Sequence, residues 1–233
     1  MAWFILQPDS QLMYETLMIK QSLPLISSFV SESEFFKYVG CIPIGSVDYV
    51  QTYATIHGIK IPKFESYPKN LHKFLYTKPK LCTFDQCKVR DFVYPIHYKS
   101  FTGGCKRKLI GKIKPNTKVW SFEPVCFLFK LRFYVAGRMI LGYGRADVTE
   151  YEMGETDFKE AKELVNKIMS SFKHAPIGYA IDVGCIEGQW YLAGLEDAWS
   201  LQFFSDENEM TVLDYTHLVA FRWMQLSCKS VLA

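Results

Sequence analysis

The strongest constraint on the fold of this chain comes from residues 125–147, VCFLFKLRFYVAGRMILGYGRAD. In the first half of this stretch, side chains alternate with the period of two that a β-strand imposes, because successive residues of a strand point to opposite faces. One face is wholly apolar, whereas the other carries Lys130 and Arg132. The stretch therefore predicts a β-hairpin turning near Gly137, with one face on a core and two cations on the other face.

Shorter patterns predict strands and helices in alternation along the rest of the 233 residues. The clearest helix is residues 155–172, where apolar side chains recur at helical spacing and Asp157 with Glu160 is expected to form a capping box. The other expected helices cover residues 9–20, 46–58 and 214–227, and the expected strands cover residues 2–7, 91–95, 118–122, 177–184 and 189–195. This alternation predicts one continuous unit of the α/β or α+β class.

Composition narrows the functional classes. Hydrophobic residues make up 49% of the chain, but no uncharged apolar stretch reaches the length of about 18 residues expected of a membrane span. The seven cysteines form no C-x-x-C pair, which favours reduced thiols in the cytoplasm over disulfides or zinc. The net charge is only +3, so nucleic acid is disfavoured as a partner unless basic residues cluster locally.

One carboxylate stands in an apolar strand. Asp182 lies between Ile181 and Val183, where an unpaired charge would be costly, so it needs a partner. Two interpretations are open, a structural ion pair and a ligand to a hard cation such as Mg²⁺. Glu196, on the next expected strand, is placed to meet Asp182.

A second candidate is the basic stretch YKSFTGGCKRKLIGKIK, residues 98–114. Its Thr-Gly-Gly sequence suits a turn with positive φ, so a solvated turn is one interpretation. A groove for single-stranded nucleic acid is a second, although residues 102–118 lack the aromatic side chains that such grooves use. A flexible loop whose backbone N–H groups and flanking lysine contact phosphates is the third.

Several segments, in this order and spacing, resemble the ATP-grasp superfamily, in a compact clade often found in bacteriophage genomes and near bacterial toxin loci. The resemblance spans most of the chain. The segments are PIGSVDYV (43–50), YPKNLHKFL (67–75), KSFTGG (99–104), FKLRFYVAGRMI (129–140) and YAIDVGCIEGQWYLAGLEDAWSL (179–201). The resemblance implies an α+β fold in which two α/β lobes enclose a cleft for ATP and Mg²⁺, with residues 1–75 as an N-terminal region and 76–233 as the ATP-grasp-like region.

The resemblance also implies roles for individual residues. Arg132 resembles the catalytic arginine that opposes the γ-phosphate or an acyl phosphate, and Asp182 and Glu196 resemble metal ligands. The implied nucleotide-binding residues are Lys78, Lys99, Thr102, Gly103, Gly104 and Lys130. The sequence departs from the family where a Glu-x-Asn pair is expected, because it has Gly194-Leu195-Glu196. Lys130 replaces an expected acidic residue, and Tyr94 replaces an expected arginine.

Two functions follow from this comparison. The first is an ATP-dependent carboxylate–amine or similar ligase that acts through an acyl phosphate, with a protein or peptide as a candidate substrate. The second is a catalytically degenerate relative that binds a protein, as an inhibitor or immunity protein of a phage or toxin system. The missing carboxylate at Gly194 favours the second, whereas the retained Arg132 and Asp182 favour nucleotide binding.

Overall fold

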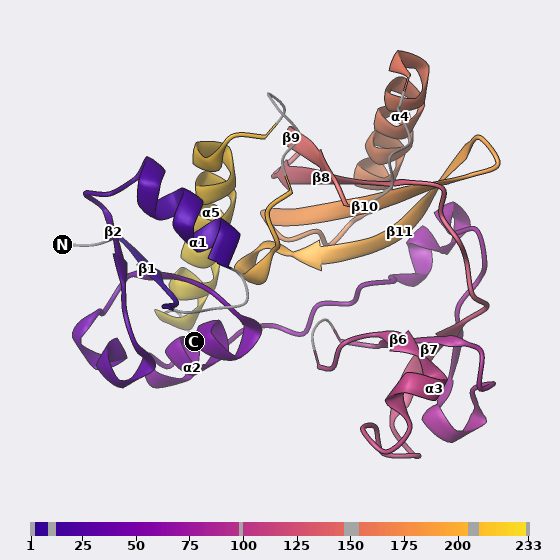
Figure 1. The fold of residues 1–233 in the computed structure, drawn as a ribbon, viewed down its shortest axis with the longest axis horizontal. Coiled ribbons are helices and arrows are strands. Elements are labelled where there is room, and N and C mark those ends of the chain that lie inside the picture. The colour runs from indigo at the N-terminus through magenta and orange to yellow at the C-terminus, as the bar shows by residue number, and fades with distance from the viewer. Residues whose placement is uncertain (1–2, 9–12, 98–99, 147–153, 205–209, 232–233) are drawn as a thin grey trace.

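The computed structural model describes residues 3–8, 13–97, 100–146, 154–204 and 210–231. Its strands form three sheets with the orders β2-β1-β3, β11-β10-β8-β9 and β4-β7-β5-β6. Figure 1 shows the first sheet on the left, the second above the centre, and the third, in magenta, at the lower right. This is the α+β architecture expected, with a cleft between the second and third sheets.

The N-terminal sheet is parallel and consists of β1 (Phe4–Leu6), β2 (Ser27–Phe29) and β3 (Ile42–Ile44). Its helices are α1 (Met13–Ser22), α2 (Val47–Ile56) and the 3₁₀ helix η1 (Glu32–Lys37). Ser46 caps α2 as expected, because its side chain accepts a hydrogen bond from the Tyr49 N–H at 3.2 Å. Gly58 follows that helix with a positive φ of 67°.

The second sheet is antiparallel and contains the predicted hairpin. Its strands are β8 (Lys130–Ala136), β9 (Met139–Arg145), β10 (Gly178–Ile186) and β11 (Gln189–Asp197). Helix α4 (Glu155–Ser171) is attached to this part of the chain. The capping box of α4 differs from the prediction: Gly154 is the N-cap, its N–H donates to the Asp157 carboxylate at 3.1 Å, and Glu160 lies one turn too late to take part.

The third sheet belongs to a smaller lobe formed by residues 78–122, hereafter the basic lobe. It contains β4 (Lys80–Thr83), β5 (Phe92–Pro95), β6 (Gly104–Cys105) and β7 (Lys118–Phe122). The short helices are η3 (Phe84–Gln86) and α3 (Lys106–Leu109), and η2 (Lys69–Phe74) precedes the lobe. A separate small core of Phe84, Cys87, Val93, Leu109 and Val119 supports it.

Helix α5 (Val212–Val231) joins the N-terminal sheet to the second sheet, because it contacts α1 and β3 as well as β8 and β10. An ion pair anchors this helix: Asp197, at the end of β11, accepts two 2.6 Å hydrogen bonds from the guanidinium of Arg222. The short helix η4 (Ala198–Ser200) follows Asp197 directly. One core therefore includes side chains from both of the regions 1–75 and 76–233, and the boundary between these regions stays a prediction.

No helix among the described residues is both long enough and apolar enough to cross a membrane.

Candidate functional site

A cavity of about 450 Å³ lies between the second sheet and the basic lobe. Aromatic side chains from both sides line it, among them Tyr67, Tyr94, Phe122 and Phe127. Charged side chains gather on its sheet side, where Lys130, Arg132, Asp182 and Glu196 contribute to the lining. Its volume and its apolar walls with a few convergent polar groups are typical of a small-molecule site.

Arg132 is the centre of the charged group. Its side chain is only 3% exposed, and its Nε and Nη2 atoms donate to the two Asp182 oxygens at 2.7 and 2.8 Å. Nη2 also lies 2.7 Å from Glu196 Oε1. One guanidinium therefore holds both carboxylates, with the bidentate geometry that arginine offers.

Strand register explains this meeting. Arg132, Asp182 and Gly194 face one another across β8, β10 and β11, so their side-chain positions form one row. A bulge between Asp182 and Val183 breaks the pairing of β10 with β11, and it leaves Ala193 as the extra residue. Gly194 places no side chain in the row, and the carboxylate of Glu196 reaches Arg132 from the next position on the same face.

Burial and charge shift the pKa values of this group. Burial raises the pKa of the Asp182 carboxyl above its usual value, although Arg132 acts in the opposite direction. Burial alone would lower the pKa of Arg132, but the carboxylates of Asp182 and Glu196 raise it well above its usual value. Burial, together with the same carboxylates, also raises the pKa of Tyr94. Arg132 is therefore permanently charged, and Tyr94 is neutral at ordinary pH.

The segment Leu201–Phe204 covers the other side of Arg132. The Phe204 ring centre lies 5.0 Å from the guanidinium carbon, which is the distance of a cation–π contact. Tyr134 holds the segment, since its hydroxyl lies 3.0 Å from the Gln202 oxygen and 2.6 Å from the Phe204 nitrogen. Gly144 permits this approach, because a Cβ there would lie 2.1 Å from the Phe204 oxygen.

Tyr67 connects the sheet to the basic lobe. Its hydroxyl donates to the Ala193 oxygen, at the bulge, over 2.9 Å. Its ring centre lies 5.3 Å from that of Tyr94 and 4.7 Å from that of Phe122, both in the basic lobe. Sequence reasoning did not select Tyr67, Tyr134 or Phe204 for the site, and the only signal was the abundance of aromatic residues, 16% of the chain.

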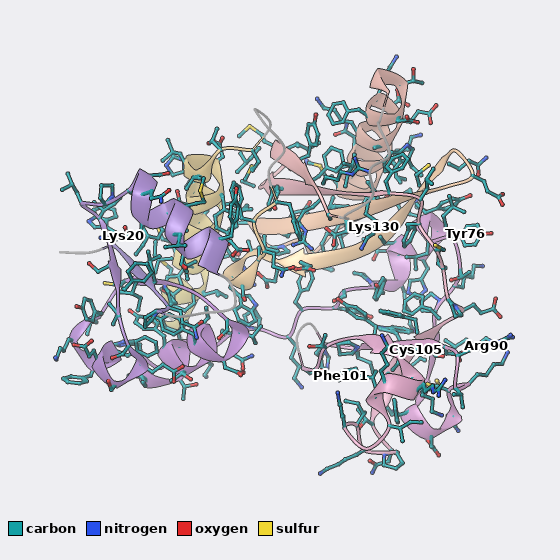
Figure 2. The ribbon with its side chains drawn as sticks, in the orientation of Figure 1. Lys20, Tyr76, Arg90, Phe101, Cys105 and Lys130 are labelled. Carbon is teal, nitrogen blue, oxygen red and sulfur yellow. The ribbon has the colours of Figure 1, made fainter. Side chains whose placement is uncertain are left out.

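The structure brings together some predicted site residues and separates others. Lys130, Arg132, Asp182 and Glu196 line the cavity, and Figure 2 shows Lys130 against the sheet that contains β8. Lys78 is exposed, and Thr102, Gly103 and Gly104 are not among the lining residues. Lys99 lies outside the described residues.

The predicted glycine loop needs a correction. Neither Gly103 nor Gly104 has a positive φ, and Gly104 belongs to β6, where it pairs with Val93. Gly103 is required for another reason: a Cβ at this position would lie 2.4 Å from the ring of Tyr94. The glycine therefore lets the chain pack against an aromatic wall of the cavity.

This packing gives a prediction with a matched control. Gly103→Ala should lower the free energy of unfolding by about 1–3 kcal/mol, because the Tyr94 ring must move to admit the methyl group. Gly104→Ala meets nothing within 4 Å and should change the free energy of unfolding by less than about 0.5 kcal/mol. Urea denaturation of both variants measures the difference. Equal effects would contradict the role assigned to Gly103.

The charged group fits the predicted magnesium site poorly. Three of the four carboxylate oxygens of Asp182 and Glu196 already contact Arg132, and Gly194 supplies no third carboxylate. Among the residues described, no cluster of three or more His, Cys, Asp or Glu side chains could hold a metal ion. As arranged, these residues do not fit an Mg²⁺ ion held by the protein, which prefers several oxygen ligands in octahedral geometry.

Comparison with protein families gives a match over residues 81–215 to a model described as an ATP-grasp domain, family 2 of its clade. No curated protein matches the chain.

Solved structures show the likeness of fold. D-Alanine–D-alanine ligase from Bacillus anthracis matches with a TM-score of 0.50 and 9% identity, over 97% of this chain and 98% of that chain. A RimK domain ATP-grasp protein from Sphaerobacter thermophilus matches with a TM-score of 0.49 and 10% identity, over 94% and 99%. Truncated Cdc123 from Schizosaccharomyces pombe matches with a TM-score of 0.30 and 12% identity, and the match spans only 37% of each chain.

Proposed function

Because this chain belongs to that second clade family of ATP-grasp domains, we propose that it binds ATP in the cavity between the second sheet and the basic lobe. The observation that carries the proposal is the placement of Lys130 and Arg132 at the sheet side of an aromatic cavity. Phosphates would meet these cations, and the base would lie against aromatic rings such as Tyr94 and Phe122. Lys78, Lys99 and residues 102–104 stay candidates for further phosphate contacts.

Ligase-like chemistry is the activity that we propose for this site, with a carboxylate activated by ATP and a protein or peptide as acceptor. Catalysis in such a reaction depends on charge neutralisation and positioning at the transferred phosphoryl group. Arg132 supplies charge there, but two carboxylates already engage its guanidinium. Gly194 supplies no metal ligand, so we expect slow turnover in the natural sequence.

The second candidate is a relative without catalysis that works by binding another protein, for instance as an inhibitor or immunity protein. Gly194 and the engagement of both carboxylates by Arg132 favour it specifically. A cytoplasmic location fits both candidates, since all seven cysteines are free thiols.

Calorimetric titration with ATP tests the proposal, and an assay for ADP release separates its two forms. Binding with slow turnover is expected, and binding with no turnover selects the second candidate. If ATP releases no heat and causes no shift in melting temperature, with or without Mg²⁺, the nucleotide site is wrongly assigned.

Restoring the missing carboxylate gives a sharper prediction. A Cβ at Gly194 would meet only the Tyr67 hydroxyl, at 3.6 Å, so the position accepts a side chain. Gly194→Glu places a carboxylate directly across from Asp182. We expect Mg²⁺ to strengthen ATP binding by about 2-fold or less in the natural sequence and by at least about 10-fold, or 1.4 kcal/mol, in the variant.

Gly194→Gln is the matched control, because it has the same size without the charge. It should leave the effect of Mg²⁺ on the ATP dissociation constant unchanged. A natural sequence that already binds ATP only with Mg²⁺ would show that the metal site is complete without residue 194.

A further inference from the structure

Charge is distributed unevenly between the basic lobe and the rest of the chain. Residues 78–122 contain eleven lysines and arginines and two aspartates, a net charge of +9. The remaining 188 residues contain sixteen basic and twenty-two acidic residues, a net charge of −6. The modest total of +3 therefore conceals a strongly basic lobe on an acidic body.

Most of the lobe's positive charge lies on its surface. Nine of its ten described cations are exposed, and only Lys106 is buried. Lys106 has a structural task, since its Nζ donates to the backbone oxygens of Asp85 at 2.8 Å and Cys87 at 2.5 Å. Of the two acids, Asp91 is buried and accepts from the Lys88 N–H and the Ser121 hydroxyl. Asp85 is the one exposed carboxylate of the described part of the lobe.

Folding of the lobe does not explain this charge. Its core is small, five buried residues, and so many like charges on one small unit weaken it through mutual repulsion. Nor does the nucleotide cavity explain it, because Lys88, Arg90 and Arg107 do not line that cavity.

These three cations instead border a separate shallow hollow. Lys88, Val89, Arg90, Cys105 and Arg107 line it, with a volume of about 590 Å³. Figure 2 shows Arg90 extending outward from the lobe. Val89 is 58% exposed, and two other aliphatic side chains of the lobe, Leu81 and Ile110, are 54% and 59% exposed. The hollow thus combines a cationic rim with an exposed aliphatic side chain.

The lining indicates the kind of partner. Carboxylates pair with lysine and arginine, and an exposed aliphatic side chain matches another aliphatic side chain. A single-stranded nucleic acid would instead need aromatic rings on which bases stack, and no aromatic side chain lines this hollow. We propose that the hollow of the basic lobe binds an acidic polypeptide segment whose carboxylates contact Lys88, Arg90 and Arg107 and whose interspersed aliphatic residues contact Val89. Such binding is independent of the nucleotide cavity.

Fluorescence anisotropy tests the proposal with three labelled probes of equal charge: a peptide in which leucines recur among glutamates, an all-glutamate peptide, and an oligothymidylate. The leucine-containing peptide should bind tightest, without ATP, and should weaken as salt rises from about 50 to 200 mM. The variant Lys88→Glu, Arg90→Glu, Arg107→Glu should bind it at least about 10-fold more weakly.

The matched control reverses three exposed lysines of α4, Lys159→Glu, Lys162→Glu, Lys167→Glu, and changes the net charge by the same amount. It should reduce binding by less than about 3-fold, because these residues lie on another element. If the triple variant of the lobe fails to fold, Arg90→Glu is compared with Lys167→Glu instead. Tighter binding of the oligothymidylate, equal binding of the two peptides, equal losses in both variants, or no binding at low salt would each overturn the proposal. Titration with ATP, measured separately, leaves this result distinct from that of the nucleotide site.

Discussion

Replacing Arg132 with methionine should lower the free energy of unfolding by about 3–5 kcal/mol at pH 7. The substitution leaves Asp182 and Glu196 close together in a largely buried site with no guanidinium between them. It also removes the cation from the Phe204 ring. Urea denaturation monitored by circular dichroism measures the loss, and Arg138→Met is the control, since Arg138 is exposed in the turn between β8 and β9.

The loss should depend on pH in a definite direction. Burial already raises the pKa of the Asp182 carboxyl in the folded protein, and removal of Arg132 removes the main influence that opposes this rise. A carboxyl whose pKa is higher in the folded state binds more protons there, so its contribution to stability is greatest below its unfolded pKa and falls as pH rises. The deficit of Arg132→Met should therefore be smaller at pH 5 than at pH 7. A deficit that grows at pH 5 would contradict this view of the carboxylates.

Asp197→Asn should have a comparable effect, about 3–5 kcal/mol, on the free energy of unfolding. Asp197 is fully buried and its two oxygens each accept a 2.6 Å hydrogen bond from Arg222, itself 4% exposed. The amide keeps the size but loses the charge, so Arg222 stays buried beside a neutral partner. The measurement is the urea midpoint and slope at pH 7.

Glu163→Gln is the control for Asp197→Asn, because it removes one carboxylate charge from an exposed position of α4 and should change stability by less than about 0.5 kcal/mol. Because Asp197 links β11 to α5, which also contacts α1 and β3, its loss should loosen the N-terminal sheet as well. Hydrogen exchange of β1 and β3 should therefore accelerate. Unchanged exchange there would show that the N-terminal sheet does not depend on this ion pair.

The parts of the fold that sequence predicted well are those in which periodicity and burial coincide. The hairpin of β8 and β9 turns at Gly137, with a positive φ of 60°, where its alternating pattern placed the turn. The partner that Asp182 required proved to be Arg132, directly across the strand pair, so the expectation of an ion pair was physically sound. Whether Asp182 and Glu196 also contact a metal stays a prediction.

Other parts of the site depend on tertiary structure that no local pattern records. The bulge at Ala193 changes which residue of β11 stands across from Asp182, and nothing in the local sequence marks it. The role of Gly103 follows from a ring nine residues away along the chain, so its conformational freedom was the wrong reason for its presence. The segment 201–204 covers Arg132 only because Tyr134, about seventy residues earlier, holds it.

Tyr67 has a mechanical consequence for entry to the cavity. The same side chain hydrogen-bonds the bulge of β11 and packs against two rings of the basic lobe. Any rotation of the lobe away from the sheet must either break the bond to Ala193 or slide Tyr94 and Phe122 past the Tyr67 ring. The opening of the cleft is therefore coupled to the backbone that positions residue 194, so a substitution at that position acts on access to the cavity as well as on its charge.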